Sequence, residues 1–165
     1  MKSIFILLIA FLICGFSVKS KVKMKNRVSN LEKCILMFEN IETQIKYSSE
    51  NIYKILKTTQ KNIDLEFLDL FLSMDLNKDI TERWSESIQK KSYNDCLKNE
   101  DVQVLCSFGK MLGTTDVDGQ INNCKAHKVM LKNCLDNARE NYNKKGNVVT
   151  TLGLLGAICF VVLVY

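Results

Sequence analysis

The chain has 165 residues without a single proline and with only seven glycines, so few positions interrupt a helix. Over long stretches its apolar residues recur every three to four positions, which is the spacing of one face of an α-helix. No stretch alternates at period two for long enough to predict a strand. The sequence therefore predicts an all-α protein.

Six stretches of helical period follow one another through short connections, which favours a six-helix bundle with antiparallel neighbours. Asp79 and Glu82 have capping-box spacing and predict the start of the fourth helix. The apolar residues expected to line the six helices are, in order, Met24, Val28, Leu31, Ile35, Phe38, Ile41 and Ile45; Ile52, Ile55 and Leu56; Leu65, Leu68, Phe71 and Met74; Ile80, Trp84 and Ile88; Val102, Leu105, Phe108 and Leu112; and Val117, Ile121, Cys124, Leu131, Leu135, Ala138 and Tyr142.

Both ends of the chain are apolar, with basic residues on the side that faces the middle. Residues 4–18 form one run, followed by five basic residues up to Arg27; residues 148–165 carry no charge and follow Lys144 and Lys145. About 18 apolar residues suffice to cross a hydrocarbon core, and basic flanks stay cytoplasmic. This pattern predicts a transmembrane anchor at 1–20, a cytoplasmic helical bundle at 21–147 and a second anchor at 148–165.

The first apolar run has a second interpretation, a cleaved signal peptide, because Lys2 and about 15 apolar residues suit one in length. Val18, Lys19 and Ser20 stand where a small-x-small cleavage site would be expected, and five basic residues follow at once. These features favour an uncleaved anchor. Cleavage remains the alternative.

The net charge of +5 does not indicate nucleic acid as a partner. Eight of the 23 basic residues flank the two apolar ends, and the other 15 are opposed by all 18 acidic ones, so the middle carries about −3. The basic residues instead suit a surface of membrane lipid.

The sequence offers no catalytic residue, cofactor site or small-molecule substrate site. Seven cysteines occur without any C-x-x-C, and Cys124 and His127, three apart on a helix, lack a second pair that would complete a metal site. We expect an interior thiol beside a half-exposed histidine. His127 has no serine or carboxylate at i±3 or i±4, and no glycine-rich phosphate loop is present.

The connection before the sixth helix is the most specific local sequence. Gly113 can adopt the left-handed conformation that ends a helix, and Thr114 or Thr115 can cap the next one, with Asp116 in its positive first turn. This structural interpretation explains the turn without any ligand.

The segment Phe108-Gly109-x-x-Leu112-Gly113-x-x-Asp116-x-x-x-Gln120 resembles the signature of the stage III sporulation protein AB family. Further similarities are Leu31 followed by Ile41-Glu42-Thr43-Gln44-Ile45-Lys46-Tyr47, the lone Trp84, and Leu152-Gly153-x-x-Gly156 near the end. Asn51-Ile52 departs from the Pro-Leu usual in that family, which concerns only how the second helix begins.

The resemblance implies a subunit of the channel apparatus that links the mother cell to the engulfed forespore during endospore formation. It implies a location in the mother-cell membrane, with a cytoplasmic domain similar to that of type II secretion platform proteins. The implied partners are a sporulation protein AA-type ATPase, other channel membrane subunits and membrane lipid. The alternative is an intramembrane structural or pore subunit without contact to the ATPase.

For a scaffold of this kind we expect the partner to contact polar residues near helix ends. The candidates are Thr114, Thr115, Asp116 and Gln120, with Glu42 as a second choice. Each has a structural alternative: Asp116 as a cap residue, and Gln120 bonding back to it at i,i+4. Trp84, with Ile80 and Ile88 on its face, is predicted to lie in the core.

Overall fold

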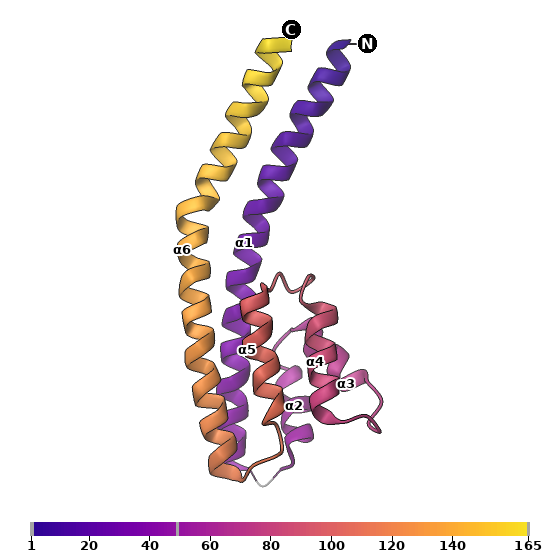
Figure 1. Cartoon of the computed structure of the whole chain (residues 1–165), viewed down its shortest axis with the longest axis vertical. Coiled ribbons are helices and arrows are strands. Elements are labelled where there is room, and N and C mark those ends of the chain that lie inside the picture. The colour runs from indigo at the N-terminus through magenta and orange to yellow at the C-terminus, as the bar shows by residue number, and fades with distance from the viewer. Residues whose placement is uncertain (1, 49, 165) are drawn as a thin grey trace. The chain divides into compact units, whose positions relative to one another are not determined.

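The computed structural model describes residues 2–48 and 50–164 (Figure 1). These residues form six α-helices and no strand, which confirms the predicted all-α class. The helices are α1 (Lys2–Tyr47), α2 (Ile52–Gln60), α3 (Glu66–Ser73), α4 (Ile80–Lys91), α5 (Asn99–Lys110) and α6 (Val117–Val164).

The two apolar ends are not separate helices, because α1 and α6 run without a break through 46 and 48 residues respectively. Within residues 2–48 and 50–164, no helix combines the length and the apolar character that crossing a membrane requires. The chain divides into two compact units: a terminal unit of Met1–Val28 with Asn137–Tyr165, and a bundle unit of Ser29–Asp136.

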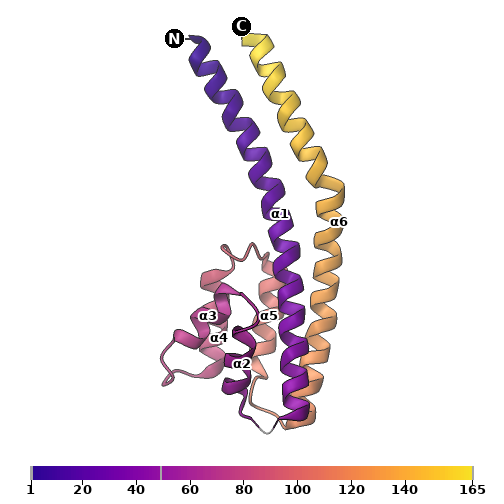
Figure 2. The ribbon, with the colours of Figure 1, turned by 180° about the vertical axis from the view of Figure 1, so that it is seen from behind.

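In the terminal unit the first part of α1 and the last part of α6 lie side by side (Figures 1 and 2). Lys21 Nζ donates a hydrogen bond of 2.9 Å to Asn147 Oδ1. Gly153 and Ala157, four residues apart, are buried, whereas Gly156 is exposed. Small residues four positions apart on one helix are the spacing that allows another helix to approach closely.

The core of the bundle unit is an aromatic cluster centred on Trp84, which is fully buried as predicted. Its indole ring lies 5.7 Å from the Phe67 ring, 5.3 Å from the Phe71 ring and 5.6 Å from the Phe108 ring, centre to centre. The Phe108 ring in turn lies 4.5 Å from the Phe38 ring of α1, centre to centre, with the two ring planes tilted by 51°. Large rings from four helices meet here, and their burial supplies much of the free energy that holds the bundle together.

The start of α4 is capped as the sequence predicts, whereas the start of α3 lies beside the carboxylate of a residue that is distant in the sequence. Asp79 Oδ1 accepts the backbone N–H groups of Thr81 and Glu82, as predicted. Helix α3 has no side-chain cap of its own at Leu65. The buried carboxylate of Asp95, about 30 residues further along the chain, lies near the backbone N–H groups of Glu66 and Phe67 at the start of α3, and these groups act to lower its pKa.

Candidate partner-binding site

The turn between α5 and α6 takes its shape from Gly113, whose φ of +73° is the left-handed conformation predicted for it. Leu112 before it is buried, while Thr114, Thr115 and Asp116 after it are exposed. The chain therefore reverses direction at Gly113 and presents three polar residues to solvent.

Asp116 is the residue that caps α6. Its Oδ1 accepts the backbone N–H of Gly119 at 3.0 Å, and α6 begins directly after it at Val117. The expectation that Thr114 or Thr115 would cap the helix is wrong, because both precede the position from which a side chain reaches the first-turn N–H groups. Thr114 Oγ1 instead donates to the Met111 carbonyl at 3.1 Å.

Gln120 lies one turn into α6 and is 7% exposed. Its Nε2 donates to the carbonyl oxygen of Met111 at 2.6 Å and to Oγ1 of Thr115 at 2.8 Å. Only its backbone N–H reaches back to Asp116, so the expected side-chain bond to that residue is not formed. Gln120 Oε1 is buried and has no hydrogen-bond partner among the described residues.

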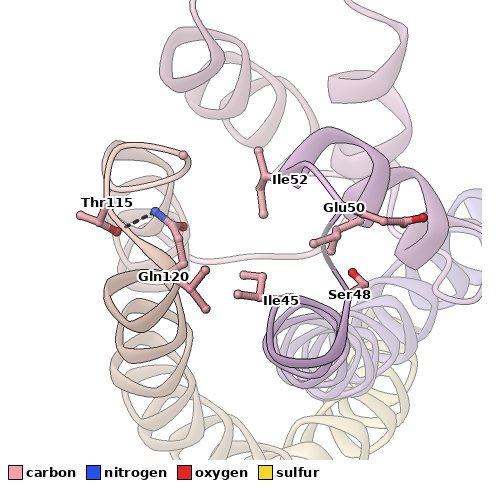
Figure 3. Close-up of a pocket in the computed structure, with 9 residues that line it drawn as sticks. Ile45, Ser48, Glu50, Ile52, Thr115 and Gln120 are labelled. Carbon is pink, nitrogen blue, oxygen red and sulfur yellow. Dashed lines mark hydrogen bonds between the residues drawn. The ribbon is translucent and has the colours of Figure 1, made fainter.

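A pocket of about 360 Å³ opens beside this turn, and we call it the turn pocket. One side is formed by the end of α1 and the start of α2, and the other by the α5–α6 turn and the start of α6 (Figure 3). Its apolar lining comes from Ile45, Ile52, Ile55 and Val117.

The polar lining of the turn pocket consists of hydrogen-bond acceptors and hydroxyl groups. Gln120 and Thr115 contribute from the α6 side, and Ser48 and Glu50 from the side of α1 and α2 (Figure 3). Ser48 Oγ is buried without a partner in the described part of the chain, and the Glu50 carboxylate pairs with Lys54. An open, acceptor-rich pocket with apolar walls is suited to a group that carries hydrogen-bond donors.

The structure brings together some of the residues that the sequence nominated and separates others. Thr115 and Gln120 line the turn pocket, while Thr114 and Asp116 lie on the adjacent exposed turn. Ser48 and Glu50 also line the pocket and were not predicted from the sequence. They belong to no motif and reach the pocket only because the α1–α2 connection ends beside the α5–α6 turn.

Glu42 lies outside the turn pocket and forms an ion pair across the bundle unit. Lys128 Nζ stands 3.1 Å from Glu42 Oε2 and 3.8 Å from Glu39 Oε1. Both partners of the closer pair are about one-fifth exposed, so the pair joins α1 to α6 at the edge of the core. This contact gives Glu42 a role in packing.

His127 is buried rather than half-exposed as expected, because it stands against the rings of Phe38 and Phe108. Its Nε2 lies 2.9 Å from Ser107 Oγ and its Nδ1 lies 2.9 Å from the Asn123 carbonyl. A carbonyl oxygen only accepts, so Nδ1 carries a proton and donates to it. The Ser107 hydroxyl donates at 2.8 Å to the Val104 carbonyl within α5, so its oxygen stands between that carbonyl and Nε2. The ring thereby ties α5 to α6.

The neighbouring Cys124 is fully buried, and burial raises the pKa of its thiol to about 12. Within residues 2–48 and 50–164, no three His, Cys, Asp or Glu side chains gather closely enough to hold a metal ion. The Ser107–His127 contact is part-buried, and the other ring nitrogen of His127 faces a backbone carbonyl.

Comparison with known proteins identifies one family. The family model described as "Stage III sporulation protein AB (spore_III_AB)" matches residues 2–165. A solved structure, "Stage III sporulation protein AB (SpoIIIAB)", is similar with a TM-score of 0.64 and 18% sequence identity, covering 71% of this chain and 96% of that one. Comparison with curated proteins found no match.

Proposed function

The chain belongs to the stage III sporulation protein AB family, and we propose that it serves as a platform subunit of the channel apparatus between mother cell and forespore. In this role it docks a sporulation protein AA-type ATPase onto the membrane complex without performing chemistry of its own. The observation that carries the proposal is the exposed α5–α6 turn, which adjoins an open pocket with unpartnered oxygen atoms. Such atoms are costly to leave unsatisfied, and a docked partner can satisfy them.

We further propose that the protein resides in the mother-cell membrane that faces the forespore, with the bundle unit in the cytoplasm. The charge pattern supports this: basic residues follow the first apolar run and precede the second, which is the arrangement of cytoplasmic flanks. The snorkelling stems of these lysines would extend each short apolar segment. Alkaline carbonate extraction of cell membranes tests it, because a peripheral protein is released into the supernatant and an anchored one is retained.

The second candidate is an intramembrane structural or pore subunit that does not touch the ATPase. It is favoured by the apolar surface at the end of α6, where five large residues are more than half exposed. These exposed side chains are available to lipid or to another channel subunit. They are Leu152, Leu154, Leu155, Ile158 and Val162.

The experiment that separates the two is co-purification of the full-length chain with the AA-type ATPase of the same genome. Asp116→Lys places a positive charge on the α5–α6 turn, and Asp116→Asn keeps an oxygen for the cap. Asp136→Lys is the matched control, since it reverses another exposed acid of α6 away from the turn. Thermal unfolding by circular dichroism verifies that each variant is folded.

We expect Asp116→Lys to lose the ATPase while Asp116→Asn and Asp136→Lys retain it. Thr114→Lys, on the same exposed turn, is expected to behave like Asp116→Lys. Retention of the ATPase by folded Asp116→Lys would show that the turn is not the docking surface. No ATPase on the wild-type chain would leave the structural subunit as the better proposal.

A further inference from the structure

We propose that the turn pocket receives the side chain of an arginine from a protein partner. The inference rests on the proposed function, in which the partner is the docked ATPase, and it adds the chemistry of the group that enters. Three properties of the pocket carry it: two oxygen atoms without a hydrogen-bond partner, apolar walls, and acidic residues in its lining or next to the lining residues in the chain.

The first acceptor is held in place by its own amide group. Gln120 Nε2 donates to Met111 O and to Thr115 Oγ1. Rotating the amide by half a turn would set Oε1 against the Met111 carbonyl, which can only accept. The oxygen is therefore kept in the side chain's other position, buried and without a partner in the described residues, in the lining of the pocket (Figure 3).

The second acceptor, Ser48 Oγ, lies in the opposite wall and is likewise buried without a partner in residues 2–48 and 50–164. Two oxygens on opposite sides of one pocket call for an occupant with several donors pointing in different directions. The guanidinium group carries five N–H donors in a planar fork and no acceptor, whereas an ammonium is a more strongly hydrated point charge. This comparison favours arginine over lysine.

The apolar walls suit the rest of the arginine side chain. Ile45 and Ile52 face the pocket from the side of α1 and α2 (Figure 3), and Val117 at the start of α6 also lines it. A methylene stem can pack against these residues while the charged end reaches the oxygens. The volume of about 360 Å³ lies at the lower end of the range for ligand pockets, which fits one long side chain.

The acidic residues in and beside the pocket lining are complementary to a cation. Glu50 lines the pocket, and Asp116 and Asp118 are exposed on the turn and the first turn of α6. Lys54 is the basic residue paired with Glu50, and its side chain is about two-thirds exposed, so it can yield to a more deeply placed guanidinium. An anionic group would meet acceptor oxygens and carboxylates together.

The test that does not depend on the ATPase is nuclear magnetic resonance of the full-length chain in detergent. N-acetyl-arginine-N-methylamide is the probe, and the matching citrulline compound is its neutral isostere. We expect the Gln120 side-chain amide resonances to shift with a Kd on the order of 1 to 10 mM for the arginine probe. The citrulline probe should bind at least about tenfold more weakly, because it lacks the charge.

Variants of the pocket test whether the arginine probe and the protein partner bind at the same place. Val117→Trp fills the mouth of the pocket from a position that is 58% exposed, and Val129→Trp makes the same change on α6 at 59% exposure, outside the pocket. Ser48→Ala removes one acceptor that has no partner, so it should weaken probe binding about fivefold without lowering the unfolding midpoint. A purely structural serine would not show that combination.

Four outcomes are distinguishable. If wild type binds both probe and ATPase, and Val117→Trp alone loses both, the inference and the proposed function hold together. If the ATPase binds Val117→Trp normally or citrulline binds as well as arginine, the inference is overturned and the platform role stands. If the probe binds and the ATPase does not, the pocket serves another partner; if neither binds, both proposals fall.

Discussion

The indole ring of Trp84 lies against the backbone of Gly109, so closely that a methyl group at residue 109 would stand 2.7 Å from Cγ of the ring. The indole N–H donates at 2.8 Å to the carbonyl of Leu105, one turn earlier in the same helix α5. Helix α4 thus packs on α5 through a tryptophan that has no space to withdraw. The glycine of the Phe108-Gly109 motif is a packing requirement of this contact.

We therefore expect Gly109→Ala to destabilise the protein by about 2 to 3 kcal/mol, because the added methyl overfills the core beside Trp84. Chemical denaturation followed by tryptophan fluorescence measures the loss at the residue concerned. Gly156→Ala is the matched control, since nothing lies within 4 Å of a methyl there and alanine favours a helix. Equal stability of the two variants would contradict the packing role of Gly109.

Gly113 is constrained by its backbone rather than by space. Its φ is +73°, and an added methyl would meet only Ile52 Cγ2, at an ordinary 3.8 Å. Gly113→Ala should cost about 1 to 2 kcal/mol, and Gly113→Asn less, because asparagine tolerates the left-handed conformation. Thermal unfolding that ranks glycine above asparagine and asparagine above alanine supports this; an alanine variant as stable as wild type would exclude it.

The buried carboxyl of Asp95 should make the stability of the protein depend on pH. Burial raises the pKa of its carboxyl to about 6, although the backbone N–H groups of Phe67 and Glu66 act to lower it. An aspartic acid in an unfolded chain has a pKa of about 3.9. Between about pH 4 and 6 the folded state therefore holds more of this proton, so the contribution of Asp95 to stability falls as the pH rises.

Urea denaturation of wild type and Asp95→Asn from pH 4 to 7 tests this contribution. The unfolding free energy of wild type minus that of the variant should decrease through this window and level off above it, since asparagine does not titrate. Parallel pH profiles for the two proteins would show that Asp95 is not the titrating group.

The hydrogen bond between Ser107 and His127 should act on stability alone. Ser107→Ala removes the hydrogen-bond partner of Nε2, at a cost of about 1 kcal/mol. Co-purification of the ATPase should be unchanged at temperatures where the variant is folded, because neither residue lines the turn pocket. Loss of binding by a folded Ser107→Ala would instead assign this pair a functional role.

Much of the local structure follows from neighbouring residues. The spacing of apolar residues predicted the six helices, Asp79 was predicted at the start of α4, and Gly113 was predicted to be left-handed after α5. These features can be read from the sequence because periodicity, caps and left-handed conformations depend on a few consecutive positions. Thr115 and Gln120, which the sequence nominated from this turn, both line the turn pocket. The burial of Trp84 followed from the apolar residues on its face.

Only the tertiary structure decided which distant groups meet. Asp95 lies near the start of a helix that begins 29 residues before it, Ser107 contacts His127, and Ser48 lies across the turn pocket from Gln120. No local pattern encodes these pairs, since each depends on how separate helices pack around the aromatic cluster. Because of this packing, the candidate site includes the pocket beside the turn as well as the turn itself. Glu42 lies outside that pocket and pairs with Lys128.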